Sequence, residues 1–184
     1  MDSAIAELKS LAQLPDRKKG TVMETNNNLY EQLIRHLAVQ PSPDKPHENV
    51  MLFDFANPEA NNFAIAEEVS YIDPLTGSHS RPDIVVYVNG IALAVIELKR
   101  SIVSVSEGIK QHLSNEKDLI PSFFTTVQFT VAANPTNDTE KDLSGFRYAT
   151  IFTPEKFWTP WKRDNHETGK LMSDIDSFLD FFNK

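Results

Sequence analysis

Two acidic side chains and one amine flank an apolar stretch in the middle of the chain, in the order Asp83, thirteen residues, then Glu97-Leu98-Lys99. Two adjacent carboxylates repel each other, and a divalent cation relieves that repulsion. Mg²⁺ prefers such oxygen ligands, and the backbone carbonyl of Leu98 is a candidate third ligand. An ammonium beside the metal can orient a water and offset charge developing on a phosphate. The pattern therefore predicts metal-assisted phosphodiester hydrolysis, with Mg²⁺ as the metal and Mn²⁺ as a substitute.

The residues between these groups predict a β-hairpin. The apolar runs DIVVYV and IALAVIEL stand on either side of Asn89-Gly90, the commonest two-residue hairpin turn. Both runs are almost continuously apolar, which predicts a hairpin at the centre of a sheet and covered on both faces. Because the strands of a hairpin are antiparallel, Asp83 and Glu97 return to the same end of the sheet.

The conformation of the turn decides whether the two carboxylates share a face. A two-residue turn at Asn89-Gly90 puts Asp83 and Glu97 on opposite faces, because side chains alternate along a strand. A three-residue loop, Val88-Asn89-Gly90, with a bulge pairs Asp83 with Val95 and makes Glu97 its diagonal neighbour on one face. We predict the bulged loop, since the site depends on a shared face.

Hydrophobic periodicity places helices around this hairpin and predicts a mixed α/β domain with a small, mostly antiparallel sheet. Helices are expected over 1–14, from the Asn26–Asn28 cluster to before Pro41, over 103–117, over 154–161 and over 172–182. Further strands are expected at 50–53, at 63–71 with an irregularity at Glu67-Glu68, at 125–132 and at 148–152. A loop is expected at 134–144.

Composition limits the function further. The chain has 184 residues, a formal net charge of −8 and no cysteine, which excludes a disulfide framework, a thiolate nucleophile and a cysteine zinc site. Its length predicts a single domain over 1–184, with 1–24 as a flexible segment or an accessory helix. No apolar run approaches the ~20 residues of a membrane helix, and no secretory signal opens the chain, so a cytoplasmic protein without a membrane partner is expected.

The acidic balance argues against a free-standing, non-specific nucleic-acid binder, which would normally be basic. The charge is uneven, however: residues 81–112 carry a net +1, and the remainder carries −9. Arg81 and Arg100 flank the strands in this region and are candidate phosphate contacts, although charges at strand ends are usually only solvated. A mildly basic rim fits DNA that another part of an assembly delivers.

The segment RPDIVVYVNGIALAVIELKR resembles the nuclease core of the R (restriction) subunits of type I restriction enzymes, within the PD-(D/E)xK superfamily. Further similarity lies in YEQLIRHL upstream, and in GIKQH, IPSFF and GFRYATIFTPEKFWTPWK downstream. The resemblance implies a restriction-endonuclease-like core, with Asp83 and Glu97 as metal ligands and Lys99 as the catalytic lysine.

The resemblance also implies supporting residues on two helices. The helix after the hairpin often carries Gln-x-x-x-Tyr in this family; Gln111 matches the glutamine, whereas Asn115 stands at the tyrosine position. Related nucleases have an upstream helical glutamate that completes the metal site. Tyr30 aligns with it here, and the neighbouring Glu31 is the candidate ligand.

The implied function is that of an Mg²⁺-dependent endonuclease domain that cuts double-stranded DNA after ATP-driven translocation. The sequence has no phosphate-binding loop of the form G-x-x-x-x-G-K-[ST], so ATP would act only through motor domains outside this chain, with 165–184 starting the connection to them. The implied partners are double-stranded DNA and the modification and specificity subunits. Two alternatives stay open: a stand-alone PD-(D/E)xK nuclease, and a catalytically dormant module for docking or DNA guiding.

Overall fold

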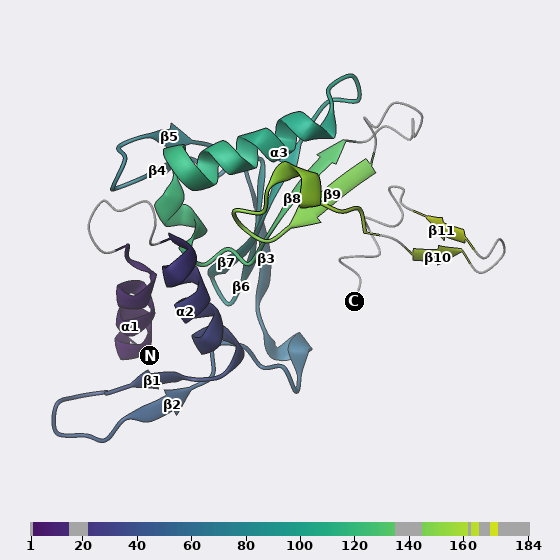
Figure 1. Cartoon of the computed structure of the whole chain (residues 1–184). Coiled ribbons are helices and arrows are strands. Elements are labelled where there is room, and N and C mark those ends of the chain that lie inside the picture. Colours follow the sequence, from purple (N-terminus) through teal and green to yellow (C-terminus); the bar gives the residue numbers. More distant parts are fainter. Residues whose placement is uncertain (1, 15–21, 135–144, 162, 166–169, 173–184) are drawn as a thin grey trace.

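The structure, a computed structural model, describes residues 2–14, 22–134, 145–161, 163–165 and 170–172 (Figure 1). Its centre is a five-stranded sheet in the order β3-β6-β7-β8-β9. These strands are Phe63–Glu67, Ile84–Val88, Ile91–Leu98, Phe129–Asn134 and Gly145–Ala149. Only β7 and β8 pair in parallel; the other neighbours are antiparallel. The predicted mixed α/β fold with a mostly antiparallel sheet and a central hairpin is confirmed, and it matches a restriction-endonuclease-like core.

The predicted hairpin is β6 and β7, but its loop differs from the prediction. Val88 pairs directly with Ile91, so the turn has two residues, and Asn89 and Gly90 adopt φ angles of 51° and 80°. Two successive positive φ angles are the mark of a type I′ turn, which Asn-Gly favours. The three-residue loop over Val88-Asn89-Gly90 is therefore wrong.

A bulge inside β7 compensates for this shorter turn. Val86 pairs with Ala94, whereas Tyr87 pairs with Ala92, so Leu93 is an extra residue on one strand. An extra residue reverses the alternation of side chains beyond it. The strands then continue as far as the pair Ile84 and Ile96, which leaves the residues just beyond that pair opposite each other.

Helices pack on one face of this sheet, the face that carries Val95 and Ala132. They are α1 (Asp2–Ala12), α2 (Val22–Ile34) and α3 (Val105–Ser114). Ser104 caps α3 by accepting a hydrogen bond from the amide of Ser106, and Ile109 of α3 packs on Ala132 of β8 and on Trp158. A single π-helical turn, η3 (Asn115–Leu119), and a 3₁₀ turn, η4 (Pro121–Thr125), follow α3 and lead back towards α2 (Figure 1).

The second helix begins earlier than predicted, because Asn26 lies inside α2 and does not cap it. It also ends earlier, at Ile34. The side-chain nitrogen of Asn26 is buried and donates to the carbonyls of Phe124, Thr125 and Val127 at 3.1, 3.0 and 2.8 Å. Leu37, predicted to lie on this helix, belongs instead to β1 (Leu37–Val39), which pairs with β2 (Glu48–Val50). The strand predicted at 50–53 therefore shares only its first residue with β2.

Among the described residues, the remaining predicted strands and helices are present, but the residues at which they begin and end differ from the prediction. The irregularity expected at Glu67-Glu68 is confirmed, since Glu68 has a φ of 50° and separates β3 from β4. The helix expected over 154–161 is only a 3₁₀ turn, and strands β8 and β9 are displaced from their predicted ranges. The other short elements are η2 (Pro58–Ala60), β4 (Tyr71–Ile72), β5 (His79–Ser80), η6 (Glu155–Phe157), β10 (Arg163–Asn165) and β11 (Lys170–Met172).

The loop predicted for 134–144, apart from the last residue of β8, lies outside the described residues. So does the helix predicted for 172–182, apart from Met172, and so does most of the expected connection at 165–184. Among the helices in the described ranges, none is long and apolar enough to cross a membrane.

The three hydrogen bonds of Asn26 lead to a stability prediction. Replacing Asn26 by the similarly sized leucine leaves three buried carbonyls without a donor, so Asn26→Leu should lower the free energy of unfolding by roughly 2–4 kcal/mol. Asn27→Leu is the matched control, because Asn27 is exposed on the same helix and its replacement should change stability by less than about 0.5 kcal/mol. Urea denaturation of both variants measures the difference, and equal midpoints would contradict this assignment.

Candidate active site

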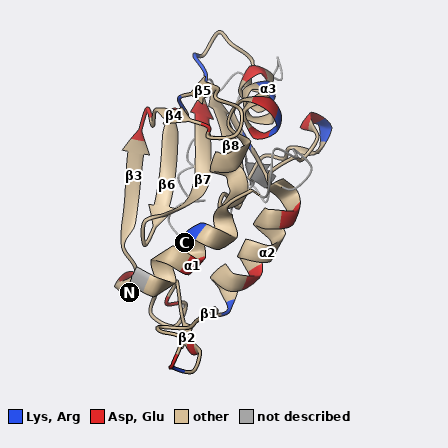
Figure 2. Ribbon diagram, turned by 90° about the vertical axis from the view of Figure 1, so that its left-hand side faces the viewer, with Lys and Arg blue, Asp and Glu red and all other residues tan. Residues whose placement is uncertain are grey.

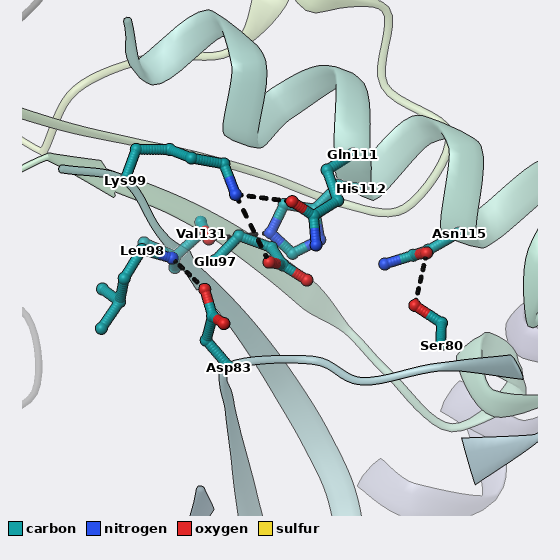
Figure 3. A network of polar contacts seen from close by, with 9 residues as sticks. All are labelled: Ser80, Asp83, Glu97, Leu98, Lys99, Gln111, His112, Asn115 and Val131. Carbon is teal, nitrogen blue, oxygen red and sulfur yellow. Dashed lines mark hydrogen bonds and ion pairs between the residues drawn. The ribbon is translucent and has the colours of Figure 1, made fainter. Parts of the chain in front are cut away.

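The two predicted carboxylates meet at the end of the hairpin where β6 begins and β7 ends. Asp83 directly precedes β6, Glu97 lies in β7, and the register Ile84 to Ile96 places them opposite each other. The amide of Leu98 donates to Asp83 Oδ2 at 2.7 Å, which fixes the Asp83 carboxylate against β7 (Figure 3). The Glu97 side chain is fully buried. The shared face that the sequence required is therefore present, with direct pairing in place of the predicted diagonal.

Lys99 brings its amine to this pair from the residue after β7. Its backbone amide donates to Ala133 of β8 at 2.8 Å, so the start of the side chain is anchored to the sheet. The Nζ atom lies 3.8 Å from Glu97 Oε2 and donates to Gln111 Oε1 of α3 at 2.5 Å (Figure 3). The structure thus groups Asp83, Glu97, Lys99 and Gln111, the four residues that the sequence singled out as catalytic.

Gly108 of α3 lies where the helix packs closely on Ala132 of β8, beside the Lys99 side chain. A Cβ atom at this position would stand 3.0 Å from the Ala132 Cβ, and 3.5 and 3.7 Å from Lys99 Cγ and Cε. The first distance is shorter than ordinary van der Waals contact. Glycine therefore lets α3 approach the sheet closely enough for Gln111, one turn further on, to reach the lysine amine.

The electrostatics of Glu97 are unusual for a carboxylate. Burial, reinforced by the negative charge of Asp83, raises the pKa of Glu97 to about 8, although the nearby Lys99 ammonium acts in the opposite direction. Both carboxyl oxygens are buried and have no hydrogen-bond partner among the residues that the structure describes. A buried carboxylate without partners is costly, which favours the protonated form of Glu97 when no cation is bound.

The carboxylates of Asp83 and Glu97, together with the backbone carbonyl of Leu98, fit a divalent cation. The amide of Leu98 faces Asp83 and that of Lys99 faces β8, so the Leu98 carbonyl also faces the Asp83 side, beyond the first residue of β6. Two carboxylates and one carbonyl suit Mg²⁺, which usually takes one or two carboxylates and keeps several waters. Within the described ranges, no group of three or more His, Cys, Asp or Glu side chains could hold a metal, so the candidate ligand set stays at these three.

The remaining predicted residues lie apart from this group. Glu31 is half exposed on α2, where its carboxylate lies 3.3 Å from Arg35, and the structure does not bring it to the carboxylate pair. Arg81 is exposed and lies 3.3 Å from Glu68. Arg100 is exposed just beyond Lys99. The region around the end of β7, near β4, β5 and α3, carries both acidic and basic residues (Figure 2).

Two buried residues of α3 and its continuation lie beside this group: His112, which was not predicted as a site residue, and Asn115, which was named without a contact. His112 donates from Nε2 to the Val131 carbonyl at 2.8 Å, and burial lowers the pKa of His112 to about 4, so the ring is neutral. Asn115, at the family tyrosine position, accepts a hydrogen bond from Ser80 through Oδ1 at 2.9 Å. Asn115 lies one helical turn after Gln111, the spacing that singled it out in the sequence.

Comparison with known proteins assigns the chain to a family. Residues 2–137 match the family described as "Type I restriction enzyme R protein N terminus". The chain belongs to this family. The matched residues include the carboxylate pair, Lys99 and Gln111, and they extend through the whole of β8.

A curated relative points to the same system. The chain is 33% identical over 111 residues to the "Putative type I restriction enzyme MjaIXP endonuclease subunit" of Methanocaldococcus jannaschii. The similarity covers 57% of this chain and 10% of the relative. The matched part of the chain therefore corresponds to about a tenth of the length of a subunit whose name contains the word endonuclease.

The raised pKa of Glu97 predicts an inverted pH dependence of stability. Between the ordinary value of 4.5 and the folded value of about 8, the folded protein binds this proton more tightly than the unfolded chain does, so stability falls as pH rises. Without metal, Glu97→Gln should gain stability relative to wild type through this window, by at most about 1.4 kcal/mol per pH unit.

Urea denaturation from pH 4 to pH 8.5 measures this difference. Glu116, whose pKa burial raises to about 7, titrates in both proteins and cancels in the comparison. Parallel stability curves for wild type and Glu97→Gln would contradict a buried, protonated Glu97.

Proposed function

We propose that the chain is the Mg²⁺-dependent endonuclease domain of a type I restriction enzyme, of the PD-(D/E)xK kind, which hydrolyses phosphodiester bonds of double-stranded DNA. The observation that supports this best is the pairing of Asp83 with the buried Glu97, with the amine of Lys99 3.8 Å from Glu97. Two carboxylates and an ammonium gathered at one end of the hairpin lower the stability of the fold, but they suit catalysis at a phosphate.

Each residue has a distinct role in this proposal. Asp83, Glu97 and the Leu98 carbonyl hold Mg²⁺, or Mn²⁺ in its place. When bound, the cation supplies Lewis-acid polarisation of a phosphate oxygen and neutralises developing charge. Lys99 orients the attacking water and stabilises the negative charge of the phosphate in the transition state. Gln111 accepts a hydrogen bond from the lysine amine and holds its Nζ beside Glu97.

The proton on Glu97 couples metal binding to pH in this proposal. Glu97 must lose its proton to become a ligand, so binding of the cation competes with protonation. Apparent affinity for Mg²⁺ should therefore rise as the pH approaches 8. The Lys99 ammonium favours the ionised carboxylate and assists that exchange.

The proposal includes partners outside the chain. Motor domains of the same subunit would use ATP to translocate DNA, and modification and specificity subunits would complete a cytoplasmic complex. The net charge of −8, against +1 for residues 81–112, supports delivery of DNA by those partners. The chain's match to only 10% of its relative is consistent with a larger R subunit.

A dormant docking or DNA-guiding module is the second candidate, because the protonated Glu97 opposes metal binding at neutral pH. Mn²⁺ titration at pH 8 separates the two functions. Binding that is lost in Asp83→Asn supports the nuclease, whereas no binding at millimolar Mn²⁺ supports the dormant module. A stand-alone PD-(D/E)xK nuclease predicts plasmid cleavage by this chain without ATP or other subunits.

Plasmid cleavage by the assembled complex tests the catalytic assignment. Lys99→Met and Asp83→Asn, introduced into the full R subunit, should each reduce the cleavage rate by at least about 100-fold, since each removes a group that acts on the transition state. ATP hydrolysis should persist in both.

Lys110→Met is the matched control for this experiment. Lys110 is an exposed lysine on α3 that pairs with Glu107, so its replacement should leave cleavage at the wild-type rate. Wild-type cleavage by Lys99→Met, or an equal loss in Lys110→Met, would reject the assignment.

A further inference from the structure

The segment that leads into Asp83 is held on one side by the sheet. Asp83 lies outside β6, so its side chain is not placed by the strand ladder itself. The carbonyls of Asp83 and Pro82 accept hydrogen bonds from the amides of Glu68 and Val69, at 2.8 and 3.2 Å. These bonds attach the segment to the chain between β3 and β4, away from α3.

On the other side, a side-chain hydrogen bond of Ser80 ties the segment to the turn that follows α3. Ser80, the last residue of β5 and three residues before Asp83, donates from Oγ to Asn115 Oδ1 at 2.9 Å. Asn115 is fully buried, and its backbone amide donates to the Gln111 carbonyl. The bond therefore joins the approach to Asp83 to the helical turn that carries the partner of Lys99.

The side-chain nitrogen of Asn115 faces the carboxylates. In Figure 3 the Asn115 oxygen points to Ser80, and the nitrogen points towards Glu97. This nitrogen is buried without a hydrogen-bond partner among the described residues. The carboxyl oxygens of Glu97 are hydrogen-bond acceptors, which favours the orientation with the donor towards them and leaves the Asn115 oxygen free to accept from Ser80.

We propose that Ser80 and Asn115 are positioning residues of the metal site, whose mutual hydrogen bond fixes the distance between Asp83 and the α3 side of the cluster. Neither residue touches the metal in this account. They act through Asp83, as supporting hydrogen bonds around metal ligands do in general. The metal part of this inference rests on the proposed function, whereas the placement of Asp83 does not.

The same hairpin offers a matched control. Thr76, in the turn between β4 and β5, donates from Oγ1 to the Leu119 carbonyl at 2.6 Å. This bond joins the same hairpin to the same segment after α3, but it lies further along the chain from Asp83. Thr76→Val removes this anchor, together with the bond from the Ser78 amide to Thr76 Oγ1, and leaves the bond between Ser80 and Asn115 in place.

The first test needs no metal and reads the position of Asp83. The Leu98 amide donates to Asp83 Oδ2 at 2.7 Å, so its hydrogen exchange, measured by NMR, reports on that contact. Exchange at Leu98 should be at least about fivefold faster in Ser80→Ala and in Asn115→Leu than in wild type. Ser80→Thr, which keeps the hydroxyl, and Thr76→Val should both exchange at the wild-type rate.

The second test measures the Mn²⁺ dissociation constant of the same variants by calorimetry. Ser80→Ala and Asn115→Leu should weaken binding about tenfold, the low end for supporting residues of metal sites, and Ser80→Thr should restore it. Unchanged Leu98 exchange in Ser80→Ala and Asn115→Leu, or equal acceleration in Thr76→Val, would overturn the proposal. A wild-type protein that binds no Mn²⁺ would instead refute the metal site, and the exchange data would still decide the positioning role.

Discussion

One extra residue in β7 determines whether this chain has a site at all. Side chains alternate with a strict period of two, and the two-residue turn at Asn89-Gly90 alone would put Asp83 and Glu97 on opposite faces of the sheet. The bulge at Leu93 reverses that alternation before the strands reach their end. The tight turn supplies a stable hairpin, and the bulge supplies the shared face.

The bulge has an electrostatic consequence. It places the partly exposed Asp83 opposite the fully buried Glu97, and burial, reinforced by the negative charge of Asp83, raises the pKa of Glu97 to about 8. Lys99 offsets part of this cost at 3.8 Å, and the close approach of α3 at Gly108 keeps the lysine in place. Such an arrangement lowers stability in the absence of a cation, which is the pattern expected where function and stability compete.

The sequence could predict the features that depend on local chemistry. Asn-Gly between two apolar runs predicted the hairpin, and the spacing of Asp83, Glu97 and Lys99 predicted their common end of the sheet. The position of the bulge was not predictable, because Leu93 stands in an apolar run with no turn residue to mark it. Asn26 resembled a helix cap because its true partners lie 98 to 101 residues further along the chain. Long-range partners of this kind leave no local pattern.

A crystal of the protein soaked in Mn²⁺ at pH 8 tests the central claim most directly, through the anomalous signal of the ion. The account predicts one peak between Asp83 and Glu97, at about 2.1 Å from an oxygen of each carboxylate and from the Leu98 carbonyl. A map with no peak at this position at millimolar Mn²⁺, or with the ion bound elsewhere and Asp83 still bonded only to the Leu98 amide, would contradict it.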